Sequence, residues 1–342
     1  MTSASNGTGT EDDFRRLVEP HRAELHAHCY RMLGSVHDAE DALQDALLRA
    51  WRALPRFEGR SSLRSWLYRI ATNTSLDLIS RRRKRVLPVD FGPSADPHDE
   101  FGEPLVESVW IEPYADERQG LEGGFAGPDA RYEQRESVEL AFVAAVQHLP
   151  ARQRAVLLLR DVLGFSARET AETLDTTIHS VNSALRRARR AVNERLPEQS
   201  QQVTLRALGD ERVREVVEGY VDALERGDID AIIAMLTDEA TWSMPPYRSW
   251  FRGHKAIAGF LTEGPFRERW RHIPTHANGQ VAVGCYLWDA ERESYVAAVL
   301  DVLTLRDAQI TAVTAFVTPE AFGRFGLPGE VRTASESACP SP

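Results

Sequence analysis

Basic and aromatic side chains gather in one stretch of the chain, Ser62–Arg85, and suit the binding of a nucleic acid. Arg64 lies beside Trp66 and Tyr68, and the stretch ends in five consecutive basic residues, Arg81–Arg85. Arginines attract backbone phosphates, and an exposed aromatic ring can stack on an unpaired base. The alternative is a solvated arginine face with Trp66 half in the core, and these residues alone leave both interpretations open.

A second polar and basic set follows a capped turn near the middle of the chain. Ser166 and Glu169 have the spacing of a capping box, which predicts a short helix over 166–174, a turn over 175–177 and a longer helix from Ile178. In a helix-turn-helix the second helix enters the major groove. Its core side would hold Val181, Leu185, Ala188 and Val192. Its DNA side would hold His179, Ser180, Asn182, Ser183, Arg186, Arg187 and Arg190, with Arg189 sharing the phosphate contacts.

The C-terminal third carries aromatic, histidine and aspartate residues that could line an apolar pocket. The main candidates are Trp242, Trp250, His276, Trp288 and Asp301, with Tyr220, Met244, His254, Trp270 and His272 as further ones. A histidine–aspartate pair in a dry pocket can transfer a proton. Polar residues on strands are more often structural, so we expect no catalytic residue. A small ligand in this domain and a structural brace or docking surface are the alternatives, and we favour the second.

Amphipathic helices would position the two basic sets. The pattern predicts a helix over 14–33 that ends at Gly34, and a helix capped by Ser35 that ends before Pro55. The central helix would follow a loop over 56–62. Its buried stripe would comprise Leu63, Trp66, Leu67, Ile70, Leu76 and Ile79.

The C-terminal third has a different pattern. Two helices, the first stopped by Gly227, precede segments with the alternation of strands, and a helix over 254–264 interrupts them. We therefore expect two all-α helical DNA-binding domains, the second a helix-turn-helix, followed by an α+β domain that folds into a cone.

Charge divides the 342 residues into the same modules. The chain has a net charge of -10, but residues 87–133 hold 2 Lys and Arg against 12 Asp and Glu, while residues 1–86 hold 15 against 11. The acidic stretch is rich in proline and glycine and predicts a linker. One aromatic island, Val109–Glu117, places Trp110 and Tyr114 in it, as in a segment that docks on the same chain or on a partner.

Three scattered cysteines, Cys29, Cys285 and Cys339, make neither a disulfide framework nor a zinc site, and we expect no metal and no cofactor. No apolar run is long enough to span a membrane, and the polar N-terminus gives no export signal, so a cytoplasmic location without membrane contact is expected.

The segments DAEDALQDALLRAWRAL and RFEGRSSLRSWLYRIATNTSLDLISRRRKR resemble the promoter-melting domain of extracytoplasmic-function sigma-70 factors, and PARQRAVLLLRDVLGFSARETAETLDTTIHSVNSALRRARRAVNERL resembles their minus-35-binding domain. The resemblance implies core RNA polymerase, through its clamp helices and flap, and promoter DNA as partners. It places polymerase contacts at Asp41, Gln44, Asp45, Arg49 and Arg52. It places minus-10 contacts at Phe57, Arg60, Ser61, Ser62, Trp66, Arg69, Asn73, Asp77, Arg81, Arg82 and Arg83. Asn182 and Ala184 depart from the family, in which basic residues are common there, so the promoter sequence does not carry over.

The island VWIEPYADE looks like the linker motif of sigma factors with a C-terminal extension, and residues 210–328 resemble the SnoaL-like branch of the nuclear-transport-factor-2-like fold. The expected organisation is a disordered start over 1–12, region 2 over 13–86, a linker over 87–133, region 4 over 134–198, a hinge over 199–209, the SnoaL-like domain over 210–328 and a flexible tail over 329–342. The implied function is that of an alternative sigma factor whose C-terminal domain regulates it in cis. The alternatives are a helix-turn-helix regulator with a ligand-sensing domain, and a SnoaL-type isomerase or cyclase tethered to a DNA-binding module.

Overall fold

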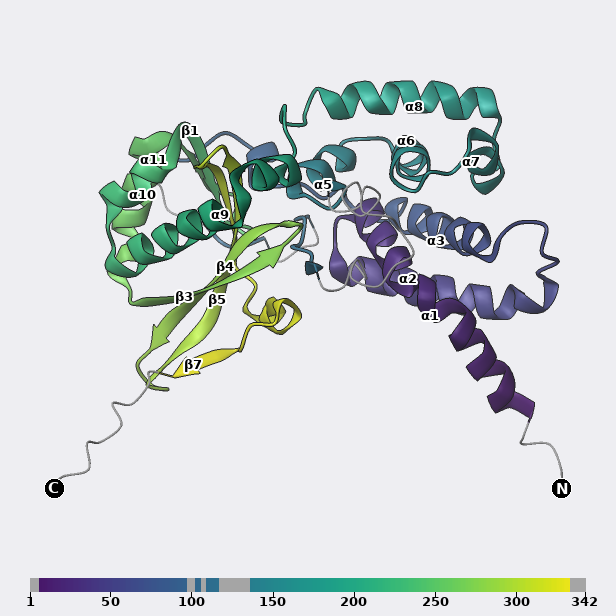
Figure 1. Cartoon of the computed structure of the whole chain (residues 1–342), viewed down its shortest axis with the longest axis horizontal. Coiled ribbons are helices and arrows are strands. Elements are labelled where there is room, and N and C mark those ends of the chain that lie inside the picture. The colour runs from purple at the N-terminus through teal and green to yellow at the C-terminus, as the bar shows by residue number, and fades with distance from the viewer. Residues whose placement is uncertain (1–5, 97–101, 106–108, 117–135, 333–342) are drawn as a thin grey trace. The chain divides into compact units, whose positions relative to one another are not determined.

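The computed structural model describes residues 6–96, 102–105, 109–116 and 136–332 (Figure 1). The chain forms two compact units, one built from Met1–Val86 and Ser108–Glu198, the other from Leu87–Glu107 and Gln199–Pro342. In the described ranges every helix is too short or too polar to cross a lipid bilayer.

The first unit opens with three packed helices, α1 (Asn6–Leu33), α2 (Val36–Ala53) and α3 (Leu63–Ile79). Gly34 takes a left-handed φ of 71° after α1, and Ser35 caps α2 by accepting a hydrogen bond from the Asp38 backbone, as the sequence predicts. Helix α1 begins at Asn6, so part of the start that we expected to be disordered is helical. Once packing fixes the later turns, each added residue extends a helix at little cost.

The same unit continues with α5 (Leu140–Gln147), α6 (Ala151–Leu157), a π-helical turn (Leu158–Val162), α7 (Ala167–Thr173) and α8 (Ile178–Asn193). The capping box is present: the Ser166 side chain accepts from the Glu169 backbone, and the Glu169 side chain accepts from the Ser166 backbone. The core residues predicted for α8 are all buried. The helix-turn-helix thus has the bounds that the sequence predicts.

The described parts of the acidic stretch are packed into the two units. Val86 pairs with Trp110 as a parallel bridge in the first unit. In the second unit the Ala95 N–H donates to the Trp250 carbonyl at 2.8 Å, and the Trp250 indole N–H donates to the Gly92 carbonyl at 2.9 Å. A few apolar residues are enough to hold these segments in place, because they dock on hydrophobic cores that other segments form. Residues 117–133 of the expected linker lie outside the described residues.

The second unit begins with α9 (Gln201–Arg226), which is kinked at Gly209, and α10 (Ile229–Met235). The hinge that we expected over 199–209 is therefore helical from Gln201. Its physical cause is a pair of hydrogen bonds: the buried Gln201 amide donates to the Leu305 carbonyl at 2.8 Å and accepts from the Leu305 N–H at 2.7 Å. The polar composition of residues 199–209 did not indicate these buried contacts.

One mixed sheet forms the rest of the second unit. Its strands are β1 (Leu236–Ser243), β2 (Trp250–Arg252), β3 (Trp270–Ala277), β4 (Gln280–Asp289), β5 (Ser294–Arg306), β6 (Gln309–Phe316) and β7 (Glu330–Arg332), with α11 (Gly253–Glu263) inserted after β2. The order is β2-β1-β6-β5-β4-β3, with β7 paired to β5. Only the β1–β6 pair is parallel among the described strands. This is the expected α+β class, although β7 makes the first residues of the expected tail part of the sheet.

Candidate nucleic-acid interface and C-terminal cavity

Helix α2 presents a mixed row of charges to solvent. The polymerase-contact candidates are all exposed, namely Asp41, Gln44, Asp45, Arg49 and Arg52. Arg49 donates to Asp45 at 3.2 Å and to Asp77 on α3 at 3.1 Å, so one arginine joins the two helices. Leu48 is 45% exposed in the same row, and sequence reasoning missed it. The sequence could have indicated this exposed residue, because Leu48 lies off the apolar stripe of its helix.

The start of α3 and the loop before it hold an aromatic pair. The Phe57 and Trp66 rings lie 4.8 Å apart at 35°. Ser62 caps α3 by accepting from the Ser65 N–H at 3.0 Å. Both side chains are half-buried, so each is partly accessible to solvent. Arg60, Ser61 and Ser62 are exposed in the loop, and Arg69, Asn73 and Asp77 continue as an exposed row along α3.

Tyr68 does not belong to this surface. It is fully buried, and its hydroxyl donates to Glu24 at 3.1 Å while its ring meets Phe165 edge-on at 5.5 Å. Burial and the Glu24 charge raise the pKa of Tyr68. The sequence left open whether Tyr68 is an exposed stacking ring, and the structure shows that it is not. The later helices of the unit cover this side of α3, which the periodicity of α3 alone does not reveal.

The basic run after α3 divides between two roles. Arg85 is 6% exposed and donates to Asp38 at 2.6 Å and to the Trp110 carbonyl at 2.8 Å. Arg82 also pairs with Asp38, while Arg81 and Arg83 are exposed. Arg85 is therefore a structural residue, although nothing in the sequence distinguishes it from its neighbours.

The aromatic island docks on α1 and α2 of its own chain. Glu112 accepts hydrogen bonds from Ser35 Oγ and the Val36 N–H, each at 2.9 Å, at the start of α2, where a carboxylate complements the helix dipole. Tyr114 is fully buried, with its ring 4.4 Å from that of Tyr30. Trp110 is 6% exposed. Of the two surfaces on which the sequence allowed this island to dock, the structure places it on the same chain.

The outer face of α8 is polar and basic. His179, Ser180, Asn182, Arg186, Arg187 and Arg190 are exposed and Ser183 is half-buried. Arg189 differs from the other arginines because it makes two hydrogen bonds to Asp161, at 2.7 and 2.8 Å. Asp161 therefore orients Arg189, whose side chain is still 56% exposed, and its expected share of the phosphate contacts stays a prediction.

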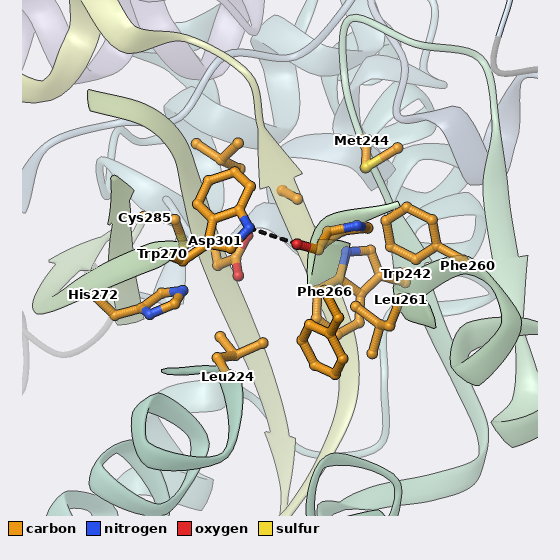
Figure 2. A pocket seen from close by; sticks show the side chains of 13 residues that line it. Leu224, Trp242, Met244, Phe260, Leu261, Phe266, Trp270, His272, Cys285 and Asp301 are labelled. Carbon is orange, nitrogen blue, oxygen red and sulfur yellow. Dashed lines mark hydrogen bonds between the residues drawn. The ribbon is translucent and has the colours of Figure 1, made fainter. Parts of the chain in front are cut away.

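A small cavity opens in the second unit between the sheet, α9 and α11 (Figure 2). Its volume is about 60 Å³. Its only carboxylate, Asp301, is 3% exposed and accepts from the Tyr220 hydroxyl at 2.8 Å. Burial raises the pKa of Asp301 to about 6, against hydrogen bonds from Tyr220 and Cys285 that favour the ionised form. The walls are Leu224, Trp242, Met244, Phe260, Leu261, Pro265, Phe266, Trp270, His272, Cys285, Val299 and Ala315.

His272 is the one histidine of this lining. It is 7% exposed, and burial, helped by Arg271, lowers its pKa to about 4. Its Nδ1 has no hydrogen-bond partner among the described residues. At neutral pH the cavity thus holds a neutral imidazole and, because neutral pH lies above the pKa of Asp301 of about 6, a mostly ionised carboxylate. Most of the remaining wall is apolar or aromatic.

Three of the five main pocket candidates lie elsewhere, which corrects the prediction. Trp250 bonds Gly92 instead of facing the cavity. Trp288 packs edge-on against Tyr295 at 5.0 Å. His276 is exposed, because it lies beyond Pro274 toward the β3–β4 turn, whereas Asp301 is level with Pro274 across Val283. The His276–Asp301 pair does not form, and only Trp242 and Asp301 of these five line the cavity.

Comparison with known families and proteins agrees with this division. The family Sigma-70 region 2 matches residues 17–85, Sigma-70 region 4 matches residues 139–192, and the SnoaL-like domain family matches residues 217–313. The ECF RNA polymerase sigma factor SigG of Mycobacterium tuberculosis is 43% identical over 320 residues, which are 92% of this chain and 84% of that protein. SigW of Bacillus subtilis, an ECF sigma factor, is 28% identical over 190 residues, 55% of this chain and 91% of that protein.

A solved structure shares the fold. The crystal structure of the Mycobacterium tuberculosis extracytoplasmic function sigma factor SigJ matches with a TM-score of 0.56 at 21% identity, covering 90% of this chain and 97% of that one. The match extends over the helical modules and the α+β domain together.

Proposed function

Because the chain belongs to the extracytoplasmic-function (ECF) family of RNA polymerase sigma factors, we propose that α2, α3 and α8 carry its contacts with polymerase and promoter DNA. As an alternative sigma factor it binds core RNA polymerase and promoter DNA and serves transcription initiation. We also propose that the C-terminal domain regulates this activity in cis and that the protein works in the cytoplasm.

A row of side chains along α3 carries the assignment. The half-buried Trp66 and the exposed Arg69, Asn73 and Asp77 follow one another at spacings of three and four residues, and the Phe57 ring packs against Trp66 at 35°. An aromatic pair followed by polar donors and acceptors suits an unstacked base and its strand. We assign the minus-10 contacts to this row, to the loop before it, and to Arg81, Arg82 and Arg83.

We assign the polymerase contact to α2 and the minus-35 contact to α8. The charged row of α2, now with Leu48 at its centre, fits a protein partner, because an apolar residue ringed by charges resembles an interface core with a polar rim. On α8, Arg186, Arg187 and Arg190 are the arginines that can reach phosphates or a guanine edge in the minus-35 element.

The C-terminal domain acts in cis through the acidic stretch. The chain leaves the first unit after Val86 and returns to it at Ser108, and both flanks are anchored: the Ile111 N–H donates to the Val86 carbonyl at 3.1 Å, and Ala95 bonds Trp250 inside the second unit. Residues 87–107 therefore join the bridge beside the basic run to the second unit through the chain itself. No catalysis enters this proposal, because His276 and Asp301 are apart.

A purified transcription system tests these assignments. Full-length protein with core polymerase should open a cognate promoter, seen as permanganate-reactive thymines, and Trp66→Ala should reduce opening while leaving core binding intact. A truncation after Glu198 should change the amount of transcript. Unchanged transcription after truncation would refute regulation in cis, and unchanged opening with Trp66→Ala would refute the minus-10 assignment.

A further inference from the structure

The first residue of α8, Ile178, has a large apolar side chain that is open to solvent. Its exposed fraction is 48%, the highest among the large apolar side chains in the part of the chain that the structure describes. Single exposed apolar residues are common on protein surfaces, so this exposure alone indicates little. The position of Ile178 is what distinguishes it. In a helix-turn-helix, the N-terminal residues of the second helix are the ones that contact base edges.

The local structure of α8 does not require an isoleucine at its start. Thr177 caps the helix: its Oγ1 accepts from the Ser180 N–H at 3.1 Å and donates to Ser180 Oγ at 3.0 Å. The Ile178 side chain takes no part in this cap. Isoleucine is a poorer helix former than alanine or the long charged residues, because its branched side chain loses rotational freedom. Neither helix formation nor core packing therefore accounts for Ile178, and a contact outside the folded chain does.

The charges around Ile178 suit an approach to DNA. The first turn of α8 holds no acidic residue, although the helix dipole favours one at that position. A carboxylate there would repel the phosphate backbone. His179, Ser180 and Asn182 are exposed beside Ile178, and the arginines assigned to the minus-35 element are exposed in the turns that follow. Ile178 is thus an apolar residue on a surface whose other exposed residues are polar or basic.

Ile178 begins a row along α8 that continues with Asn182 and Arg186. The three residues are spaced by four, which makes them neighbours on the helix surface, and all three are exposed. Asparagine suits an adenine edge and arginine suits a guanine edge. An aliphatic side chain suits the 5-methyl group of thymine, the one apolar group that the bases present in the major groove. The row can therefore read bases from its first residue onward.

We propose that Ile178 is a specificity-determining residue that contacts the 5-methyl group of a thymine in the minus-35 element. The inference rests on the proposed assignment of α8 to that element. A β-branched side chain keeps essentially one χ1 angle in a helix, so Ile178 presents its methyl groups with little loss of freedom on binding. The contact removes apolar surface of both partners from water, and only thymine supplies the methyl group.

Deoxyuridine tests this contact, because it differs from thymidine only by the absence of the methyl group. Full-length protein bound to core polymerase first selects its minus-35 element from a pool of random duplexes. Each thymine of the selected element, on either strand, is then replaced by deoxyuridine, and fluorescence anisotropy gives the Kd. At one thymine the parent protein should lose affinity by about fourfold, the value of one buried methyl group. In Ile178→Ala the same replacement should leave the affinity unchanged.

Two further variants serve as controls. Leu17→Ala removes an aliphatic side chain of α1 that is 46% exposed, close to the exposed fraction of Ile178. Its fourfold penalty for deoxyuridine should persist. Ile178→Val keeps the branched β-carbon and loses one methylene group, so it should retain a penalty of about twofold. A general effect of removing exposed apolar surface would not reproduce this order.

Three results would overturn the inference. Equal affinity of the parent for thymine and deoxyuridine at every position would mean that no methyl group is read. A fourfold penalty that persists in Ile178→Ala would assign the methyl contact to another residue. Equal losses of Ile178→Ala on both duplexes, together with weaker core binding, would place Ile178 against polymerase. In each case a selected element exists, so the assignment of α8 stands. Failure to select any minus-35 sequence would instead refute that assignment, and the inference with it.

Discussion

Glu112, far along the chain, accepts the backbone hydrogen bond of Val36 at 2.9 Å and so closes the start of α2. The same carboxylate accepts from Ser35 Oγ and lies 2.9 Å from His37 Nδ1. Ser35 caps the helix by accepting from the Asp38 N–H, and Glu112 accepts from the N–H groups of Val36 and His37. The helix that we assign to polymerase contact thus depends on a residue of the aromatic island.

Replacing Glu112 by Gln should lower the free energy of unfolding of the first unit by about 1–2 kcal/mol, because the helix start loses a charged acceptor. Urea denaturation followed by circular dichroism measures this. Glu172→Gln is the control: Glu172 pairs with Arg168 on an exposed surface, and its loss should cost less than about 0.5 kcal/mol. Equal effects of the two variants would contradict the capping role.

Replacing Trp66 by Ala should reduce promoter opening by about tenfold, in line with the value of one base–aromatic stack. Trp66→Phe should restore most of the opening, because a ring of any kind can stack. Permanganate reactivity of the melted region reports opening, and co-purification reports core binding. Failure of Trp66→Phe to restore opening would show that the indole N–H, rather than stacking, matters.

The arginines of α8 should separate into two classes. Arg187→Ala should weaken binding of the minus-35 element by holoenzyme by about 1–3 kcal/mol, whereas Arg189→Ala should have a smaller effect, because Asp161 already holds Arg189. Fluorescence anisotropy at several salt concentrations measures both, and the salt slope should fall by about one for Arg187→Ala alone. Equal salt slopes for the two variants would contradict the distinction.

Asp301 should make the second unit less stable as pH rises. Its folded pKa of about 6 lies above the ordinary value of 3.8, so the folded state holds the proton more tightly. The linked stability is full below pH 3.8 and is lost as pH rises to about 6, a total of about 3 kcal/mol. Asp301→Asn keeps an acceptor for Tyr220 without the charge, so its stability relative to the parent should increase over this range in pH-dependent denaturation.

His272 should act in the opposite direction. Its pKa of about 4 lies below the ordinary value of 6.5, so stability is full above pH 6.5 and is lost as pH falls toward 4. His272→Gln should be relatively more stable at pH 4 than at pH 7. A parallel shift of both variants at every pH would show that neither group titrates differently in the folded state.

The sequence predicted elements that depend on local patterns and missed contacts made over long separations. Val181 and Leu185 are buried as the period of α8 requires, and the Ser166 capping box forms. Tyr68 is hidden by Phe165, which is far from it in the chain, so no window around α3 could show its burial. The composition of residues 87–133 likewise predicted a linker. Composition shows how few apolar residues a segment has, but it does not show where those apolar residues dock.

The same limit applied to the cavities. Asp301 and Trp242 were found because they alternate on strands, but the level of a residue along the sheet depends on register, and this separates His276 from Asp301. The basic run was found as a whole. The path of the chain after α3 determines what each basic residue contacts. Arg85 pairs with buried Asp38, whereas Arg83 lines a cavity.

The bond between Trp250 and Gly92 has a practical consequence for exchanging parts between relatives. A chimera that took residues 199–342 from one parent and everything before them from another would graft a domain without the segment that completes its edge, since residues 87–107 belong to the same compact unit. A sound graft therefore needs three crossover points, near residues 86, 108 and 198. The segment between the first two must come from the same parent as the C-terminal domain.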